Sequence, residues 1–85
     1  MPRKTSKKIL DAVRRAVSGT LNREMDVEVE RQEGDRWAVT LVRGKERSVA
    51  IGLEGWEMDA ILHVPLVPAH RRGIFLRQYR ILTGE

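Results

Sequence analysis

Apolar side chains near the start of the chain recur at the spacing of one helix face. At about 100° per residue, a helix over residues 5–18 gathers its apolar positions on one arc and its charged positions on the opposite arc. Thr5 or Ser6 can cap its start by accepting a backbone N–H bond, and Gly19 can adopt the left-handed conformation that ends a helix. The pattern predicts an amphipathic helix. Its inward positions are Ile9, Leu10, Val13, Ala16 and Val17.

Two stretches that alternate between apolar and polar residues follow, at 25–32 and 36–42. Such alternation is typical of strands with one buried face. A loop of three residues between them brings the apolar side chains of both stretches onto the same face, so the pattern and the loop length predict one hairpin. The expected cross-strand pairs are Val29–Val39 and Val27–Leu41.

Residues 44–53 fit two different structures. In one, Val49, Ile51 and Leu53 alternate with small or polar residues in a third strand, and the fold is α-β-β-β-α. In the other, residues 46–51 form a short helical turn that Gly52 ends. Periodicity over so few residues does not distinguish the two, so both alternatives stay open.

The C-terminal third of the chain predicts one helix, a loop and a further element. The helix spans residues 55–63, because Pro65 imposes an extended conformation on the residue before it. Residues 65–73 have the composition of a loop, and residues 74–82 have the apolar and aromatic composition of a strand. A helix fits that last stretch as well, with Phe75, Tyr79 and Leu82 on one side.

The length and composition restrict the class of protein. With 85 residues we expect a single domain over residues 1–85, in which residues 1–4 are a disordered basic tail. The absence of Cys excludes disulfides, Cys-based metal sites and a thiol nucleophile. No apolar stretch approaches the roughly 20 residues that cross a bilayer, and no secretory signal is visible. We therefore expect a cytoplasmic protein with no membrane partner.

The net charge of +4 conceals two basic ends around an acidic middle. Residues 1–23 hold seven basic residues and one acid, a net charge of +6, whereas residues 24–35 hold six acids and one base, a net charge of −5. Residues 36–63 hold four of each, and residues 64–85 hold four bases and one acid. Basic ends suit nucleic acid or another anionic surface. The first predicted strand carries alternating carboxylates, and we expect such a face to be solvated or paired with Lys or Arg. These carboxylates are Asp26, Glu28 and Glu30.

Residues with catalytic or ligand chemistry are few. His63 and His70 are the only histidines, and Asp59 lies one helical turn before His63, but these are too few ligands for a metal site. No nucleophile–base arrangement, P-loop or dinucleotide motif is present, so we expect no enzyme, no cofactor and no small-molecule substrate. Trp56 can stack on a nucleobase, but we expect it, like Trp37, in a core that has few other aromatic side chains.

The stretch Ile51–Gly55 has the spacing I-G-x-x-G and is followed by the apolar Met58. It resembles the nucleotide-binding core of KH domains of type II, the bacterial form, and looks most like the KH domain of the Jag RNA-binding proteins. The resemblance covers about residues 7–63. It implies an α+β fold of order α-β-β-α-α-β, in which a three-stranded mixed sheet packs against the helices. Residues 46–51 are then a short helix, and residues 74–82 are the last strand.

The resemblance also implies a function. KH domains bind about four nucleotides of single-stranded RNA, with the phosphates against the glycine loop. Ile51, Met58 and Ile61 stand where the apolar floor lies in such domains, and basic residues at both ends of the chain can add phosphate contacts. The candidate RNA-binding residues are Ile51, Gly52, Leu53, Glu54, Gly55, Met58, Lys7, Lys8, Arg14, Arg15, Arg71, Arg72, Arg77 and Arg80.

The two residues between the glycines favour a second hypothesis. Leu53 and Glu54 give the loop none of the positive charge that RNA-binding KH loops usually carry. A carboxylate there repels a phosphate by about 1 kcal/mol or more. We therefore expect weak or non-specific binding of single-stranded RNA. The alternative is a protein-interaction module on a KH-like fold that has lost RNA binding.

Overall fold

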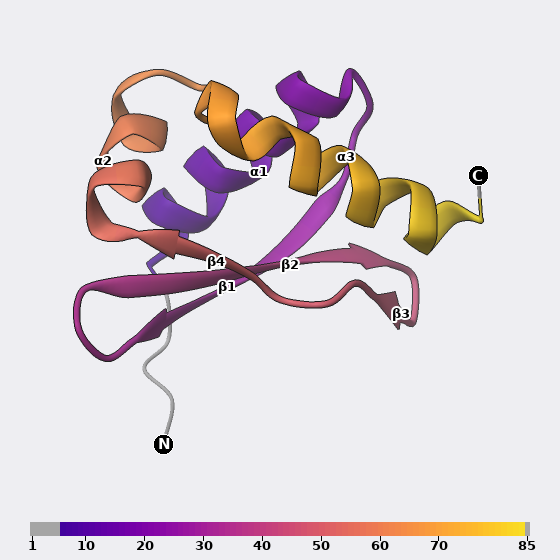
Figure 1. Cartoon of the computed structure of the whole chain (residues 1–85), viewed down its shortest axis with the longest axis horizontal. Coiled ribbons are helices and arrows are strands. Elements are labelled where there is room, and N and C mark those ends of the chain that lie inside the picture. The colour runs from indigo at the N-terminus through magenta and orange to yellow at the C-terminus, as the bar shows by residue number, and fades with distance from the viewer. Residues whose placement is uncertain (1–5, 85) are drawn as a thin grey trace.

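In the part of the chain that the structure describes, residues 6–84, three helices lie on one face of an antiparallel sheet and leave the other face open (Figure 1). The structure is a computed structural model, and the predicted tail of residues 1–4 lies outside the described residues. The fold class is α+β, as expected. The elements in chain order are α1 (Lys7–Leu21), β1 (Asp26–Gln32), β2 (Arg36–Arg43), β3 (Glu46–Arg47), β4 (Ile51–Glu54), α2 (Gly55–His63) and α3 (Ala69–Thr83).

The first helix is amphipathic, as predicted, and its cap is Ser6, whose hydroxyl accepts a hydrogen bond from the Ile9 amide at 3.3 Å. The predicted end at Gly19 is wrong, because α1 continues to Leu21. Leu21 is buried in the core, and this burial favours the added half-turn. Asn22 then ends the helix in a left-handed conformation with φ 57°. The fully buried positions of α1 are Val13, Ala16 and Val17.

Strands β1 and β2 form the predicted hairpin in the predicted register. The three-residue turn between them contains Gly34 and Asp35, both with positive φ, of 70° and 58°. Glycine and aspartate are among the residues that adopt this conformation most readily, which is why the loop can be so short. The expected pairs Val29–Val39 and Val27–Leu41 are confirmed.

Residues 46–54 complete the sheet and do not form the short helix that the KH resemblance implies. Both β3 and β4 pair with β2 in antiparallel orientation. Their registers differ by one residue, since Val42 faces Arg47 whereas Val39 faces Ile51. One extra residue therefore lies between β3 and β4, and it forms a β-bulge.

The side chain of Ser48 satisfies the backbone at this bulge. Its Oγ accepts a hydrogen bond from the Leu41 amide at 2.9 Å, and the Ser48 amide donates to the Leu41 carbonyl at 2.9 Å. The bulge also interrupts the alternation of the strand, so that Val49 is 71% exposed. This interruption explains why the sequence pattern alone left two alternatives.

The last third of the chain differs most from the expected fold. α2 has the predicted span and ends before Pro65. α3 begins inside the predicted loop of residues 65–73 and continues through the predicted strand of residues 74–82, so both predictions are wrong there. Phe75 and Leu82 are buried and Tyr79 packs against the core. These three side chains share one side of the helix, as the alternative prediction of a helix expected. The sheet of the described residues is consequently antiparallel throughout, not mixed, and the order α-β-β-α-α-β is not the one found.

The core lies between the sheet and the three helices. Trp37 is only half-buried at its margin, where the Arg31 guanidinium lies 5.7 Å from the centroid of the indole ring. Within residues 6–84 no helix has the length and apolarity needed to cross a bilayer. The largest fully buried apolar side chains are Phe75, Leu41, Ile51, Leu53, Met58 and Ile61.

Replacing Ser48 by alanine tests the bulge. The Ser48→Ala variant leaves the part-buried Leu41 amide without its side-chain acceptor. We expect the free energy of unfolding to fall by about 1–2 kcal/mol, measured by urea denaturation. Ser48→Thr keeps the hydroxyl and serves as the control. An equal loss in both variants would contradict the role of the hydrogen bond.

Candidate functional site

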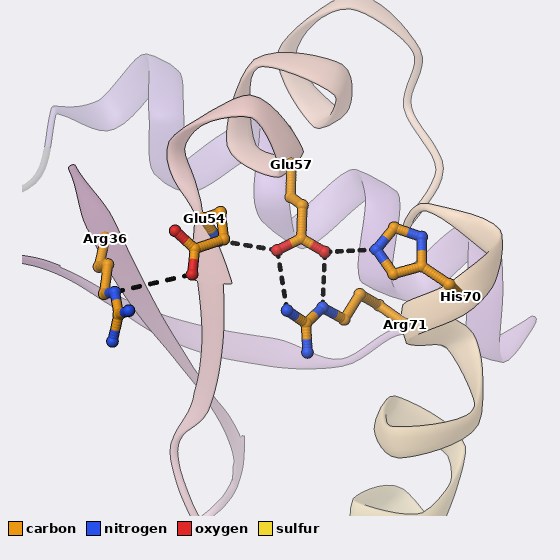
Figure 2. A network of polar contacts seen from close by, with 5 residues as sticks. All are labelled: Arg36, Glu54, Glu57, His70 and Arg71. Carbon is orange, nitrogen blue, oxygen red and sulfur yellow. Dashed lines mark hydrogen bonds and ion pairs between the residues drawn. The ribbon is translucent and has the colours of Figure 1, made fainter.

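The one charged side chain that is fully buried in the described residues is Glu57, in the first turn of α2. Arg71 of α3 holds its carboxylate through two hydrogen bonds, from Nε at 2.5 Å and from Nη2 at 3.0 Å. His70 Nε2 lies 2.6 Å from the same carboxylate, and the backbone amide of Glu54 donates to it at 2.7 Å (Figure 2). Glu57 therefore joins the start of α2 to the start of α3.

Competing effects act on the pKa of Glu57. Burial raises the pKa of this carboxyl, but hydrogen bonds from Arg71, the Glu54 amide and His70, together with the charge of Arg71, lower it to about 2. In return, the hydrogen bond to Glu57 raises the pKa of Arg71. The carboxylate is thus ionised at any physiological pH, and the pair is a permanent structural contact.

The glycine that begins α2 has a steric explanation. A side chain at Gly55 would overlap the carboxylate of Asp35, which projects from the β1–β2 turn onto the start of the helix. The second glycine of the I-G-x-x-G sequence therefore makes room for a contact within the fold. Gly52 is an exposed strand residue of β4 with open space beside it.

The other residues of that sequence are not accessible as a group. Ile51, Leu53 and Met58 are 1%, 2% and 1% exposed, because they form part of the core. Glu54 is half-buried and forms an ion pair with Arg36 at 3.6 Å (Figure 2). The structure therefore does not assemble an apolar floor over which RNA can lie at this position.

The open face of the sheet is acidic and its charges are largely paired. Glu28 accepts two hydrogen bonds from Arg47, at 2.9 and 3.0 Å, and these lower the pKa of its carboxyl. Asp26, at the start of the same strand, forms an ion pair with Arg14 at 3.5 Å. The expectation of a solvated or paired strand face is confirmed for these two carboxylates.

A large polar groove lies at the end of the sheet where β1 begins and β2 ends. It has a volume of about 860 Å³, and its walls come from α1, the α1–β1 loop, the β2–β3 turn and the end of α3. We call it the arginine groove. Asp26 in its wall is already paired with Arg14, whereas Arg23 and Arg43 have no ion pair among residues 6–84. Its charged and aromatic lining side chains are Arg14, Arg23, Glu24, Asp26, Arg43 and Tyr79.

A smaller and mostly apolar groove lies where α2 meets the start of α3. It has a volume of about 360 Å³ and is formed by α2, the loop after it and the start of α3. We call it the tryptophan groove, because Trp56 stands at its edge and is 61% exposed. The prediction of a core position for Trp56 is wrong, since its neighbour Glu57 takes the buried position at the start of α2.

The predicted basic residues are distributed over several surfaces. Arg14 lines the arginine groove and Arg72 lines the tryptophan groove. Arg71 is occupied by Glu57 and is not available to a ligand. The remaining basic candidates are exposed on the helices without lining either groove: Lys7, Lys8, Arg15, Arg77 and Arg80.

Sequence reasoning missed Arg23, Arg43 and Tyr79 as possible ligand contacts. They come from three separate segments, and only the helical conformation of residues 74–82 brings Tyr79 to the two arginines. It also missed Glu57, although a glutamate between Trp56 and Met58 at the start of an apolar helix is a signal for a buried, paired carboxylate.

Comparison of the chain with known protein families, curated proteins and solved structures finds no match. Among residues 6–84 no group of three or more metal-ligating side chains is present. His63 Nδ1 instead lies 2.7 Å from the Asp59 backbone carbonyl one turn earlier. The function therefore has to be inferred from the two grooves and the charges around them.

A Glu57→Gln variant tests the buried pair. Because the folded-state pKa of about 2 lies below the ordinary 4.5, the ionised carboxylate stabilises the fold above pH 4.5, and this contribution is lost as the pH falls towards 2. We expect Glu57→Gln to lower the free energy of unfolding at pH 7 by about 3 kcal/mol. The difference from the natural protein should shrink between pH 5 and pH 2 in urea denaturation.

The matched control is Glu28→Gln, which removes a carboxylate with the same two-bond arginine contact on an exposed surface. We expect little change in stability from it, because water screens an exposed pair. Equal effects of the two substitutions at pH 7 would contradict the importance of burial.

Proposed function

We propose that the protein binds single-stranded RNA weakly and without sequence preference, through the arginine groove. The observation that supports this most is that Arg23 and Arg43, which have no ion pair in the described part of the chain, line the same groove as Tyr79. Guanidinium groups bind phosphates through two parallel hydrogen bonds, and an aromatic ring can stack on an unpaired base whatever its identity.

The surrounding charges favour an anionic ligand. Lys45 lies two residues after Arg43 in the β2–β3 turn, and Arg80 follows Tyr79 on α3. Glu24 is the carboxylate of the groove that no arginine neutralises among residues 6–84, since Asp26 is paired with Arg14. The balance is modestly positive, which fits weak binding dominated by phosphate contacts.

Two other surfaces fit RNA less well. The open face of the sheet presents carboxylates at Asp26, Glu28 and Glu30, which repel phosphates. The I-G-x-x-G segment has its apolar side chains in the core and the Glu54 carboxylate at its surface. The arginine groove lies outside the I-G-x-x-G segment, so RNA binding there does not depend on the resemblance to KH domains.

Binding should depend on salt and on the two unpaired arginines. With a single-stranded oligoribonucleotide we expect the Arg23→Ala/Arg43→Ala variant to bind roughly tenfold more weakly at 50 mM salt. The slope of log K against log salt should fall by about 1.4, because each phosphate contact of a single strand contributes about 0.7. Fluorescence anisotropy over a salt series measures both quantities.

The control for charge alone is Arg36→Ala/Arg47→Ala. It removes the same two charges from residues that are already paired, with Glu54 and Glu28. We expect a clearly smaller change in the salt slope. No binding by the natural protein at 50 mM salt, or equal losses in the two double variants, would overturn RNA binding at the arginine groove.

A specific observation also favours a second candidate function, a protein-interaction module. Ile74 and Ile81 are 40% and 66% exposed on α3. Residues seven positions apart lie on the same side of a helix, so these two isoleucines form an apolar stripe at the surface. An apolar stripe on an exposed helix is a frequent contact for a partner protein.

Affinity purification tests this second candidate. If the stripe binds a protein, a partner should remain bound after ribonuclease treatment and should be lost from an Ile74→Ser/Ile81→Ser variant. Val49→Ser removes an exposed apolar side chain from the β3–β4 segment and is the control. Loss of every bound protein on ribonuclease treatment would rule the module out.

A further inference from the structure

The orientation of Trp56 is fixed although most of its surface is exposed. One face of its indole ring stacks on the imidazole of His70, with centroids 5.3 Å apart and planes inclined by 20°. His70 is in turn held by the buried carboxylate of Glu57, which Arg71 also binds. An exposed aromatic ring that is already immobilised loses little conformational entropy when a ligand stacks on it.

The tryptophan groove beside this ring has the size and lining of a site for one planar group. Its walls are apolar and include Ala60, Val64, Leu66 and Pro68. Volumes of about 300 Å³ and above are typical of small-ligand sites, and apolar walls with a few polar groups are their usual lining. The polar side chains at this groove are Asp59, His63 and Arg72.

The charge near the groove favours an anionic occupant. α3 contains four arginines and no acidic residue between Ala69 and Thr83, and Glu57 neutralises only Arg71. Arg72 Nε donates a hydrogen bond to the Val67 carbonyl at 3.1 Å, which fixes the arginine at the groove. Its terminal guanidinium nitrogens have no bonded partner among residues 6–84 and can bind a phosphate.

Each groove includes at least one side chain of α3. Arg72 lines the tryptophan groove and Tyr79 lines the arginine groove. Seven residues correspond to two helical turns, so the Cα atoms of these two residues are about 10.5 Å apart along the helix axis. About three stacked nucleotides cover this length at 3.4 Å each.

We propose that the tryptophan groove binds one unpaired nucleobase of the single strand whose backbone occupies the arginine groove. The base stacks on the free face of the Trp56 indole, and Arg72 contacts the adjoining phosphate. This inference rests on the proposed RNA binding and adds a second contact to it. The other class of occupant for an apolar groove is a peptide, which the experiment distinguishes from a base.

Tryptophan fluorescence gives a direct measurement. In a Trp37→Phe variant the only remaining tryptophan of the chain is Trp56. Titration with a single-stranded octaribonucleotide should quench its emission, whereas an abasic oligonucleotide of the same length and charge should bind more weakly and leave the emission nearly unchanged.

In the chain with Trp37 intact, Trp56→Leu should weaken octamer binding roughly tenfold and abasic binding little. Trp37 contacts the core, so the Trp37→Phe variant can fail to fold. In that case the emission of the natural protein is compared with that of Trp56→Phe. Quenching by the octamer in the natural protein but not in Trp56→Phe then shows stacking on Trp56.

The outcomes separate the two proposals. RNA binding that depends on Arg23 and Arg43, with unchanged Trp56 emission and no effect of Trp56→Leu, would overturn the base site and leave RNA binding at the arginine groove intact. No RNA binding by the natural protein at 50 mM salt would overturn both. A protein partner that survives ribonuclease treatment and is lost in Trp56→Leu, but not in the Val49→Ala control, would assign the groove to a peptide and overturn the base site.

Discussion

The buried carboxylate of Glu57 is the contact on which the arrangement of the helices depends. An ionised carboxyl without partners costs several kcal/mol to bury, so Glu57 is tolerated only while Arg71, His70 and the Glu54 amide bind it. α3 in turn buries only Phe75 and Leu82 along its 15 residues, while Leu76 and Tyr79 pack against the core in part. Its position therefore depends strongly on the Glu57–Arg71 pair. Both grooves include side chains of α3, and so both depend on this pair for their shape.

The fold also explains why the net charge of +4 is a poor guide to the surface. The acidic stretch contains strand β1, in which Glu28 pairs with Arg47 of the sheet and Asp26, at the strand's start, pairs with Arg14 of α1. Among the described residues, most basic side chains of the two chain ends belong to α1 and α3, which cover one face of the sheet. Acidic side chains are therefore concentrated on the sheet, whereas the two grooves include side chains of the helices.

The sequence predicts local structure well where a pattern is long and regular. The first helix, the hairpin with its register and the span of α2 follow from periodicity, a three-residue loop and Pro65. It fails where a single contact decides between two conformations. Ser48 stabilises a bulge that interrupts the alternation of the third strand, and Phe75 and Leu82 find their partners only as a helix. The I-G-x-x-G spacing likewise allows two explanations. The spacing of Gly52 and Gly55 is typical of a ligand-binding loop. In the structure, however, Gly55 leaves room for the Asp35 carboxylate inside the fold.

Strand β1 has a consequence for how copies of the protein behave towards one another. β1 is the first strand in the order of the described sheet, and its alternating carboxylates form a row along it. Two β1 strands placed edge to edge would set the rows formed by Asp26, Glu28 and Glu30 against each other across the joined sheet. The mutual repulsion of these rows would oppose extension of the sheet through this strand.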